Sequence, residues 1–233
     1  MAEAILDLKN VCFSWKNSGR ELLNLPELLV EQHEHVFLRG PSGNGKSTLL
    51  ALVGGILVSD SGTLKVLGKE IKNLSSSSRD SFRVDHIGFI FQLFNLLPYL
   101  SIEENVMLPL SFSKIRAERA GKTKLEQINE AHRLLIALEL EEPLAEKSTV
   151  VELSVGQQQR VAAARALIGN PELVIADEPT SALDSDLRHS FLELLFSECK
   201  KSGSTLLFVS HDSSLSELFK KVISMNEINI VNK

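Results

Sequence analysis

Eight consecutive residues carry the clearest chemistry in the sequence. Residues 40–47 (GPSGNGKS) match the pattern GxxxxGK(S/T), in which glycines let several backbone N–H groups face one phosphate chain. Lys46 would neutralise the β- and γ-phosphates, and the Ser47 hydroxyl can bind Mg²⁺. The segment therefore predicts a site for a nucleotide and Mg²⁺. We expect the phosphate contacts to come from Gly40, Ser42, Gly43, Asn44, Gly45, Lys46, Ser47 and Thr48.

Two acidic residues at the end of an apolar run would supply the second part of such a site. Residues 173–176 (LVIA) predict a buried strand, and Asp177 and Glu178 follow it directly. Asp177 could hold the water shell of the metal, while Glu178 could orient or deprotonate the water that attacks the γ-phosphate. Acids after a strand are also common helix caps, but the phosphate segment upstream favours the catalytic interpretation.

The residues around the glycine-rich segment predict the elements that must position it. Val36 to Leu38 form a short apolar run that ends at Gly40, and apolar residues recur at helical spacing after Lys46, as far as Ile56 and Leu57. Phosphate loops lie between a strand and a helix, in this order. An ordinary glycine-rich turn needs neither the strand before it nor the helix after it, so this context favours a phosphate site. Upstream, residues 8–15 alternate, which predicts a half-buried strand.

Strand and helix patterns continue to alternate along the chain. Further strands are predicted at 63–67, 86–91 and 205–209, and helices at 124–140, 155–168 and 185–201. Such alternation indicates a parallel sheet with crossover helices, and residues 93–155 fit a helical insertion. Residues 75–78 (SSSS) are expected to form a solvated loop.

One further motif narrows the class of protein. Residues 153–160 (LSVGQQQR) are similar to the signature LSGGQ, and the helix after it, of the nucleotide-binding subunits of ATP-binding cassette (ABC) transporters. All six sequence elements of that family occur in the family's order, and the resemblance covers nearly the whole chain. They are the phosphate loop from Gly40, the Q-loop residue Gln92, the signature at Ser154, the acidic pair Asp177 and Glu178, the D-loop-like segment 181–184 and the switch residue His211.

The resemblance implies an α/β fold that consists of one ABC ATPase domain over residues 1–233. Its phosphate-loop core would have a mostly parallel sheet and an N-terminal antiparallel β subdomain. The core with this β subdomain would comprise residues 1–92 and 156–233, and residues 93–155 would form an inserted α-helical subdomain.

The resemblance also implies how ATP would be bound and hydrolysed. Two copies would face each other head to tail, with each ATP between the phosphate loop of one copy and the signature of the other. Ser154 and the N–H of Gly156, at a helix start, would then meet the γ-phosphate. The implied catalytic residues are Lys46, Gln92, Glu178 and His211, the implied Mg²⁺ ligands are Ser47, Gln92 and Asp177, and the further nucleotide contacts are Gln157 and Asp184.

Two other side chains have a role by alignment with the family. Trp15 aligns with the aromatic A-loop residue that stacks on adenine; tyrosine is usual there, but stacking needs only a π face. The alternative is that Trp15 packs its strand and Phe13 takes its place. Of the six histidines, His211 is the one that ends an apolar strand, where it could hydrogen-bond the γ-phosphate.

Val155 departs from the family signature, because it replaces the first of the two glycines. A β-branched side chain there restricts the backbone beside the phosphate site. Since Gln92, Glu178 and His211 are all present, we expect an active ATPase. The alternative is a degenerate site that binds ATP without turnover.

Residues 87–110 resemble the branch of the family that includes lipoprotein-releasing, macrolide-exporting and cell-division ATPases. The similar segments are IGFIFQ at 87–92, FNLLP at 94–98, ENV at 104–106 and LPL at 108–110. In that branch the ATPase drives a separate transmembrane permease subunit, which favours export or substrate release. The alternative is a non-transport ABC ATPase that regulates a membrane complex, as in cell division. The apolar stretch 94–100 would dock the membrane subunit, unless it packs within the helical subdomain.

Composition bears on the partners, the localisation and the class of the protein. The 233 residues carry a net charge of −5, with 43% hydrophobic and 24% charged residues, as in an ordinary globular protein, and this charge argues against a nucleic-acid partner. Without a long apolar stretch or an export signal, we expect a cytoplasmic protein that is peripheral on the inner face of the membrane. Cys12 and Cys199 suggest neither a disulfide nor a zinc site. ABC ATPases of DNA repair or translation would need coiled-coil arms or two cassettes, which the sequence lacks.

Overall fold

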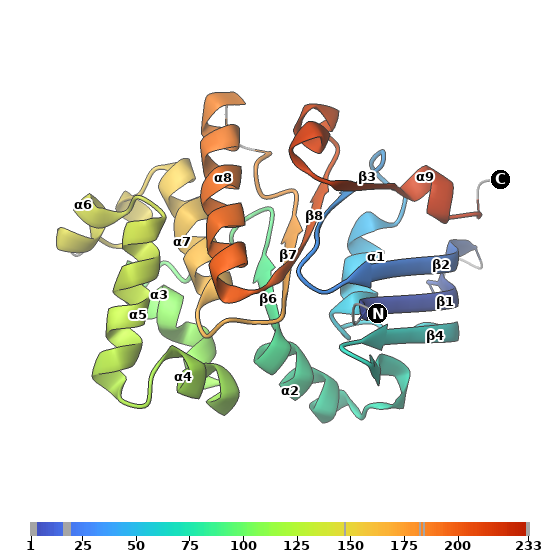
Figure 1. Cartoon of the computed structure of the whole chain (residues 1–233), viewed down its shortest axis with the longest axis horizontal. Helices are drawn as coiled ribbons and strands as arrows, with labels where there is room; N and C mark the ends of the chain where they lie inside the picture. The colour runs from blue at the N-terminus through green and yellow to red at the C-terminus, as the bar shows by residue number, and fades with distance from the viewer. Residues whose placement is uncertain (1–3, 16–19, 147, 182, 184, 232–233) are drawn as a thin grey trace. The chain divides into compact units, whose positions relative to one another are not determined.

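Residues 4–15, 20–146, 148–181, 183 and 185–231 are described by the computed structural model (Figure 1). The chain divides into two units, of which the first comprises residues 1–83 and 205–233 and the second comprises residues 84–204. Each unit contains its own paired strands, and each holds part of the predicted site. The α/β fold expected from the sequence is confirmed.

The first unit contains the antiparallel sheet that was predicted near the N-terminus. Its strands are β1 (Ala4–Ser14), β2 (Glu21–Glu31), β4 (Ser61–Val66) and β5 (Lys69–Glu70). They pair in the order β2-β1-β4-β5, and each neighbouring pair is antiparallel. Burial of leucine, isoleucine, valine and phenylalanine side chains from β1 and β2 stabilises this sheet.

A bulge in β1 explains why the strand pattern is only partly visible in the sequence. Leu8 and Val11 are both fully buried although they are three positions apart, whereas side chains two or four positions apart share a face in a regular strand. Between them, Asn10 has a φ of 51° and lies where the register of β1 against β4 shifts. Gly62 accommodates this bulge, because an added Cβ there would lie 2.1 Å from the Asn10 carbonyl oxygen. β2 is not among the predicted strands, because two consecutive exposed residues, Pro26 and Glu27, interrupt its alternation in the same way.

The first unit also contains three parallel strands. β3 (His35–Arg39) lies between β8 (Thr205–Ser210) and β9 (Lys221–Ser224). Phe37 is paired with Phe208 in the β3–β8 register, and their ring centroids lie 6.0 Å apart. All residues of β8 are buried, as is typical of a strand that is covered on both faces. The strands predicted at 36–38 and 205–209 are thus confirmed.

The helices of the first unit show two differences from the sequence prediction. They are α1 (Lys46–Val53), η1 (Ile71–Asn73), η4 (Ser213–Leu218), α9 (Met225–Ile228) and α2 (Ser76–His86), whose last turn extends into the second unit. α1 ends at Val53, with Gly54 as its C-cap and Gly55 after it at a φ of 66°. Ile56 and Leu57 therefore lie outside the helix, although the helical spacing predicted them to belong to it. The loop predicted at 75–78 is wrong: the Ser75 hydroxyl accepts a hydrogen bond from the Ser78 N–H (3.2 Å) and caps α2, since serine is a preferred N-cap.

The second unit combines a parallel strand pair with a set of helices. β6 (Ile87–Ile90) pairs in parallel with β7 (Leu173–Asp177). The helices are α3 (Ile102–Met107), η2 (Leu108–Ser111), α4 (Lys114–Ala120), α5 (Lys124–Ala137), α6 (Glu141–Ala145), η3 (Val150–Glu152), α7 (Val155–Leu167) and α8 (Ser185–Ser202). Among the residues described above, no helix has both the length and the apolar character that a membrane crossing requires.

Helix α7 is the central helix of the second unit and packs unusually closely. Its alanine-rich middle is buried, and an added Cβ on Gly88 of β6 would lie 2.2 Å from the Ala166 carbonyl oxygen. Its C-terminal end is held by the buried guanidinium of Arg116, which donates to the carbonyl oxygens of Ala166 (2.7 Å) and Ile168 (2.8 Å). Burial lowers the pKa of Arg116 to about 10, and the negative end of the helix dipole offsets part of this cost.

Candidate active site

The phosphate loop connects β3 to α1 in the first unit, as the sequence predicted. Lys46 is the first residue of α1, and its side chain is buried. Its ammonium group donates to the carbonyl oxygens of Gly40 (2.6 Å) and Pro41 (3.0 Å). These bonds place a positive charge inside the loop, beside the backbone N–H groups that open the helix.

Two glycines of the loop are required for different reasons. Gly43 and Gly45 have φ values of 85° and 82°, in the left-handed region that glycine adopts at little cost. An added Cβ on Gly45 would lie 2.5 Å from a methyl carbon of Leu23, whereas an added Cβ on Gly43 would meet nothing within 4 Å. Gly45 is therefore fixed by packing and conformation together, while Gly43 faces open space where a phosphate could approach.

The other predicted contacts of the loop differ in exposure. Ser42 and Ser47 are exposed, and Asn44 and Thr48 are half-buried. The Asn44 amide donates a hydrogen bond to the side chain of Asn226, which fixes the middle of the loop. The Ser47 hydroxyl lies in the first turn of α1 and is accessible to a ligand.

Trp15 and Phe13 can be distinguished by their exposure. Trp15 follows β1 and is 49% exposed, while Phe13 is buried. The two rings meet edge to face, with centroids 5.2 Å apart. A pocket of about 490 Å³ lies beside them and is also lined by Ile56 and Asp60. This arrangement favours Trp15 over Phe13 for stacking on a ligand, although the adenine contact itself stays a prediction.

His211 lies at the same edge of the parallel strands as the phosphate loop. Arg39 of β3 and Ser210 of β8 are register partners, so Gly40 and His211 are the next residues at the carboxyl ends of two neighbouring strands. The imidazole is exposed. Asp212 then caps η4 by accepting a hydrogen bond from the Ser214 N–H (3.0 Å). The structure therefore brings His211 and the phosphate loop together.

Gln92, Asp177 and Glu178 form a comparable group in the second unit. Ile90 of β6 and Ala176 of β7 are register partners, so all three polar residues lie at the carboxyl ends of this strand pair: Asp177 is the last residue of β7, and Gln92 and Glu178 follow the strands. Gln92 lies exposed in the turn after β6, and both acids are half-buried. Such strand edges are where ligands bind in open α/β folds.

Glu178 has a backbone conformation that is uncommon for a residue other than glycine. Its φ is 46°, in the left-handed region that costs a non-glycine residue about 1 kcal/mol. The turn after it is closed by a hydrogen bond from the Ser181 N–H to the Glu178 carbonyl oxygen (3.3 Å). The conformation redirects Glu178 relative to Asp177, so the two acids need not serve the same ligand.

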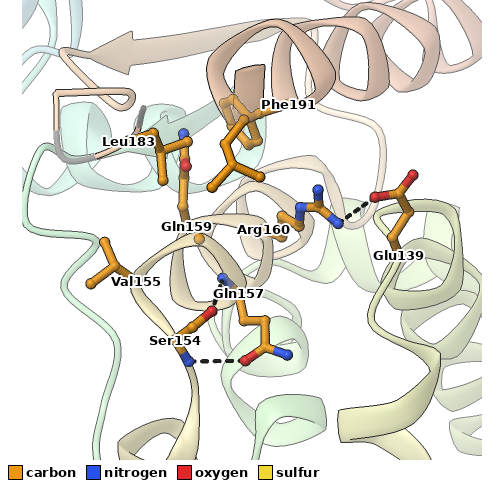
Figure 2. Close-up of a pocket in the computed structure, with 10 residues that line it drawn as sticks. Glu139, Ser154, Val155, Gln157, Gln159, Arg160, Leu183 and Phe191 are labelled. Atoms are coloured by element: carbon orange, nitrogen blue, oxygen red, sulfur yellow. Dashed lines mark hydrogen bonds and ion pairs between the residues drawn. The ribbon is translucent and has the colours of Figure 1, made fainter. Parts of the chain in front are cut away.

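The signature segment forms the start of α7 (Figure 2). The Ser154 hydroxyl accepts the Gln157 N–H (3.3 Å), and the Gln157 side chain accepts the Ser154 N–H (2.9 Å), which is a capping box. Val155 is 47% exposed beside this cap. An added Cβ on Gly156 would lie 3.7 Å from Leu183, an ordinary contact, so packing within the chain does not explain this glycine.

One predicted contact lies outside the described residues. Asp184 belongs to the D-loop-like segment, and its nucleotide contact stays a prediction. Leu183 is buried, and its N–H donates to the Thr180 carbonyl oxygen (3.2 Å), which forms a turn before α8.

The structure also shows supporting residues that the sequence analysis missed. Met225 of α9 packs against the phosphate loop, since an added Cβ on Gly40 would lie 2.9 Å from the Met225 Cβ. Arg165 of α7 donates to the carbonyl oxygen of Asn95 (2.7 Å) and also to that of Phe94. Phe94 and Asn95 both have positive φ, so this buried arginine fixes the unusual turn after Gln92. The sequence signal that could have identified Arg165 was an arginine within the alanine-rich stretch of a predicted helix.

The chemistry of the expected metal ligands fits Mg²⁺. A hydroxyl, an amide oxygen and a carboxylate, from Ser47, Gln92 and Asp177, are hard oxygen donors. Within the described ranges, no cluster of three His, Cys, Asp or Glu side chains could hold a metal ion without other ligands.

Comparison with known proteins places these features in context. Residues 23–181 match the sequence model of the ABC transporter family. The lipoprotein-releasing system ATP-binding protein LolD of Porphyromonas gingivalis is 36% identical over 96% of this chain and 97% of its own. The macrolide export ATP-binding/permease protein MacB of Campylobacter jejuni is 40% identical over 97% of this chain, which corresponds to 33% of that protein.

A solved structure is also similar over most of the chain. It is a dimeric structure of a post-hydrolysis state of the ATP-binding cassette MJ0796, from Methanocaldococcus jannaschii, bound to ADP and Pi. The TM-score is 0.82 at 36% identity, and the match covers 94% of this chain and 93% of that one.

Proposed function

Because the chain belongs to the ABC transporter family, we propose that it binds and hydrolyses ATP as an energy-supplying subunit of a membrane transport system. The observation that carries this proposal is the phosphate loop, with Lys46 folded into it and two left-handed glycines that turn its backbone. His211 shares the strand edge of that loop, which is where a γ-phosphate would lie.

The loop would bind ATP by exchanging hydrogen bonds. Lys46 now donates to two carbonyl oxygens of the loop, and β- and γ-phosphate oxygens would replace these neutral acceptors with charged ones. The backbone N–H groups before α1 would add further donors. Trp15 would contribute its exposed ring to the adenine.

The residues of the strand edges would carry the hydrolysis step. Glu178 would accept a proton from the attacking water, Gln92 would orient that water, and His211 would hydrogen-bond the γ-phosphate. Mg²⁺, when bound, would neutralise phosphate charge, and Ser47, Gln92 and Asp177 would hold it. Asp177 and Glu178 differ in backbone conformation, which supports separate roles for the two acids.

Two copies of the chain would share each ATP. The N–H groups at the start of α7, near Ser154 and Gly156, form an anion-binding helix terminus, and no packing within the chain requires glycine at position 156. A phosphate from a second copy would explain both features. The dimeric state of the similar cassette MJ0796 supports this arrangement.

The partner would be a separate transmembrane permease subunit, to which this chain would bind at the inner face of the membrane. LolD belongs by its name to a lipoprotein-releasing system, and MacB by its name combines an ATP-binding part with a permease. This chain corresponds to a third of MacB, the part that aligns with the ATP-binding cassette described above. The relatives' names favour export or release over uptake.

The substitution Glu178→Gln tests the proposal. Loss of the base should lower phosphate release from Mg²⁺ and ATP by about a hundredfold or more, while ATP binding is kept. The trapped ATP should also shift the variant to twice the mass of the chain in sedimentation. Glu193→Gln, at an exposed position on α8, is the matched control and should behave as the wild type.

Two results would contradict it. Equal phosphate release from the wild type and Glu178→Gln would refute the role of Glu178. No ATP-dependent phosphate release from the wild type would refute the proposed activity as a whole.

A further inference from the structure

Helix α9 contacts the phosphate loop, although the two segments lie at opposite ends of the sequence. Ser224, the last residue of β9, is the register partner of Arg39, the last residue of β3. Gly40 and Met225 are therefore the next residues at the carboxyl ends of two neighbouring parallel strands, and β9 runs directly into α9 (Figure 1). The start of α9 thus lies beside the start of the loop.

The contact is made at two points of the loop. Met225 is fully buried, and an added Cβ on Gly40 would lie 2.9 Å from the Met225 Cβ, so the first residue of the loop packs closely against the first residue of the helix. Further along, the side-chain amide of Asn44 donates a hydrogen bond to the side-chain oxygen of Asn226. α9 therefore contacts both the beginning and the middle of the loop.

α9 is itself joined to β2, which also packs against the loop. Asn229 is the buried C-cap of α9; its side chain accepts a hydrogen bond from the Asn24 N–H (2.9 Å) and donates to the Leu22 carbonyl oxygen (3.0 Å). Between these two residues, a methyl carbon of Leu23 would lie 2.5 Å from an added Cβ on Gly45. The loop thus contacts two elements that are bonded to each other, so α9 is a fixed support.

Asn44 occupies the part of the loop that most needs such a support. It lies between Gly43 and Gly45, whose φ values are 85° and 82°, and glycine has the greatest freedom of backbone rotation. The Asn44 N–H reaches the Pro41 carbonyl oxygen at 3.4 Å, which is long for a hydrogen bond, so this backbone bond holds the turn weakly. The side-chain bond to Asn226 therefore limits the rotation of the segment whose N–H groups would face a phosphate.

We propose that Asn226 is a positioning residue for nucleotide binding, because it holds Asn44 and the N–H groups around it in the conformation that binds phosphate. An ordered loop loses less conformational entropy when its ligand binds, so the preorganised loop has the higher affinity. Asn226 acts through Asn44 and makes no contact with the nucleotide. The inference rests on the proposed function for the identity of the ligand, whereas the order of the loop is a property of the chain alone.

Loss of the Asn226 side chain should weaken nucleotide binding. Isothermal titration calorimetry with Mg²⁺ and ADP measures this binding without turnover, and Asn226→Ala should raise the dissociation constant by about three- to tenfold, the equivalent of one hydrogen bond. Asn73→Ala is the matched control, because it removes an exposed asparagine of the same unit that donates to Glu70 (3.3 Å). This control should bind ADP as the wild type does.

A second comparison tests whether Asn226 acts through Asn44. In a chain that already carries Asn44→Ala, the further change Asn226→Ala should leave the dissociation constant of ADP within about twofold, because the bond between the two side chains is already absent. A direct contact between Asn226 and the nucleotide would instead weaken binding in both backgrounds.

Two further measurements separate positioning from a general loss of structure. Without nucleotide, the NMR backbone order parameters of Gly43 and Gly45 should fall in Asn226→Ala and should stay unchanged in Asn73→Ala. In ATP turnover, Asn226→Ala should raise KM severalfold and keep kcat within about twofold, as expected for a residue that affects binding and not the chemical step.

Three results would overturn the proposal. They are equal ADP affinity in the wild type and Asn226→Ala, unchanged order parameters of the loop glycines in that variant, and a loss of affinity that persists when Asn44→Ala is already present. A wild type that binds no ADP would refute the proposed function, while lower order parameters in Asn226→Ala would still show that Asn226 orders the loop.

Discussion

Three single residues in left-handed conformations shape the candidate site. Gly43 and Gly45 turn the phosphate loop, and Glu178 ends β7 with the same sign of φ. Glycine adopts this region at little cost, whereas glutamate does so only where its surroundings hold it there. The loop glycines are thus explained by geometry alone, while the strain at Glu178 supports the catalytic role proposed for it.

The two loop glycines offer a controlled comparison at this scale. Gly43→Ala should lower the unfolding free energy by about 1–2 kcal/mol through backbone strain. Gly45→Ala carries the same strain and a clash with Leu23, so it should cost about 1–3 kcal/mol more. Urea unfolding of both variants without nucleotide measures the difference, and equal stability would show that the loop moves away from Leu23.

At the scale of elements, α7 makes contacts that hold several other segments of the second unit in place. Ser154 and Gln157 cap its start, and Arg116 from α4 holds its end. Between them, Arg165 reaches out of the helix to fix the turn that follows Gln92. One helix thereby connects the signature, the Q-loop residue and the helical part of this unit.

Removal of the arginine at the end of α7 should destabilise the second unit. Arg116→Met would leave the carbonyl oxygens of Ala166 and Ile168 buried and unpaired, which should cost about 2–3 kcal/mol in denaturant unfolding. Arg119→Met, on the same helix but more exposed, should cost less than about 1 kcal/mol. A loss at Arg116 no larger than that at Arg119 would contradict the capping role.

Glu172 links three elements and gives a pH-dependent prediction. Burial alone would raise its pKa, but hydrogen bonds from His86 (3.0 Å) and Arg119 (2.7 Å) outweigh burial and lower the pKa from 4.5 to about 2. A carboxyl whose folded pKa is depressed stabilises the protein above its unfolded pKa, and this contribution is lost as the pH falls toward the folded value.

The difference in unfolding free energy between the wild type and Glu172→Gln should therefore be largest at about pH 6 and should decrease as the pH falls to about 3. Urea unfolding at a series of pH values measures this difference. Glu193→Gln, at an exposed position, should show no comparable change. A difference that widens toward low pH would mean that Glu172 is not held in its charged form.

At the scale of the whole molecule, the apolar stretch after Gln92 stays the predicted docking surface for the proposed permease. Leu93 and Tyr99 are 83% and 78% exposed, while Phe94 is buried between them. Buried Asn105 holds the stretch in place through the Leu97 N–H (2.8 Å) and carbonyl oxygen (3.0 Å). The stretch thus packs partly within its own unit and still presents large apolar side chains on a fixed loop.

Charges on this surface should detach the subunit from its membrane partner. The double substitution Leu93→Glu and Tyr99→Glu should lower co-purification with membranes that contain the permease by at least about tenfold, with ATP binding unchanged. Leu97 is half-buried, so its substitution would also disturb the loop. Leu125→Glu, on exposed α5 surface, is the control. Unchanged attachment of the double variant would place the partner elsewhere.

The sequence was most informative where the chemistry is local. The phosphate loop, the signature and the acidic pair are each made by neighbouring residues, and their strand and helix contexts follow from short apolar patterns. The same reasoning failed at two elements. In β2, two consecutive exposed residues break the alternation of buried and exposed side chains, and at the start of α2 the serines form a helix cap and not a loop. Interactions with partners far along the chain were not visible in any window of sequence.

By itself, then, the sequence determined the family and the ATP-binding motifs, because a backbone that curls around a phosphate needs only glycines and a lysine in immediate succession. Only the tertiary structure decided that Met225 closes one side of the loop, that Trp15 and not Phe13 is exposed, and that Asn226 is hydrogen-bonded to Asn44. Burial and hydrogen-bond partners depend on residues that are distant in the sequence and become neighbours only when the chain folds.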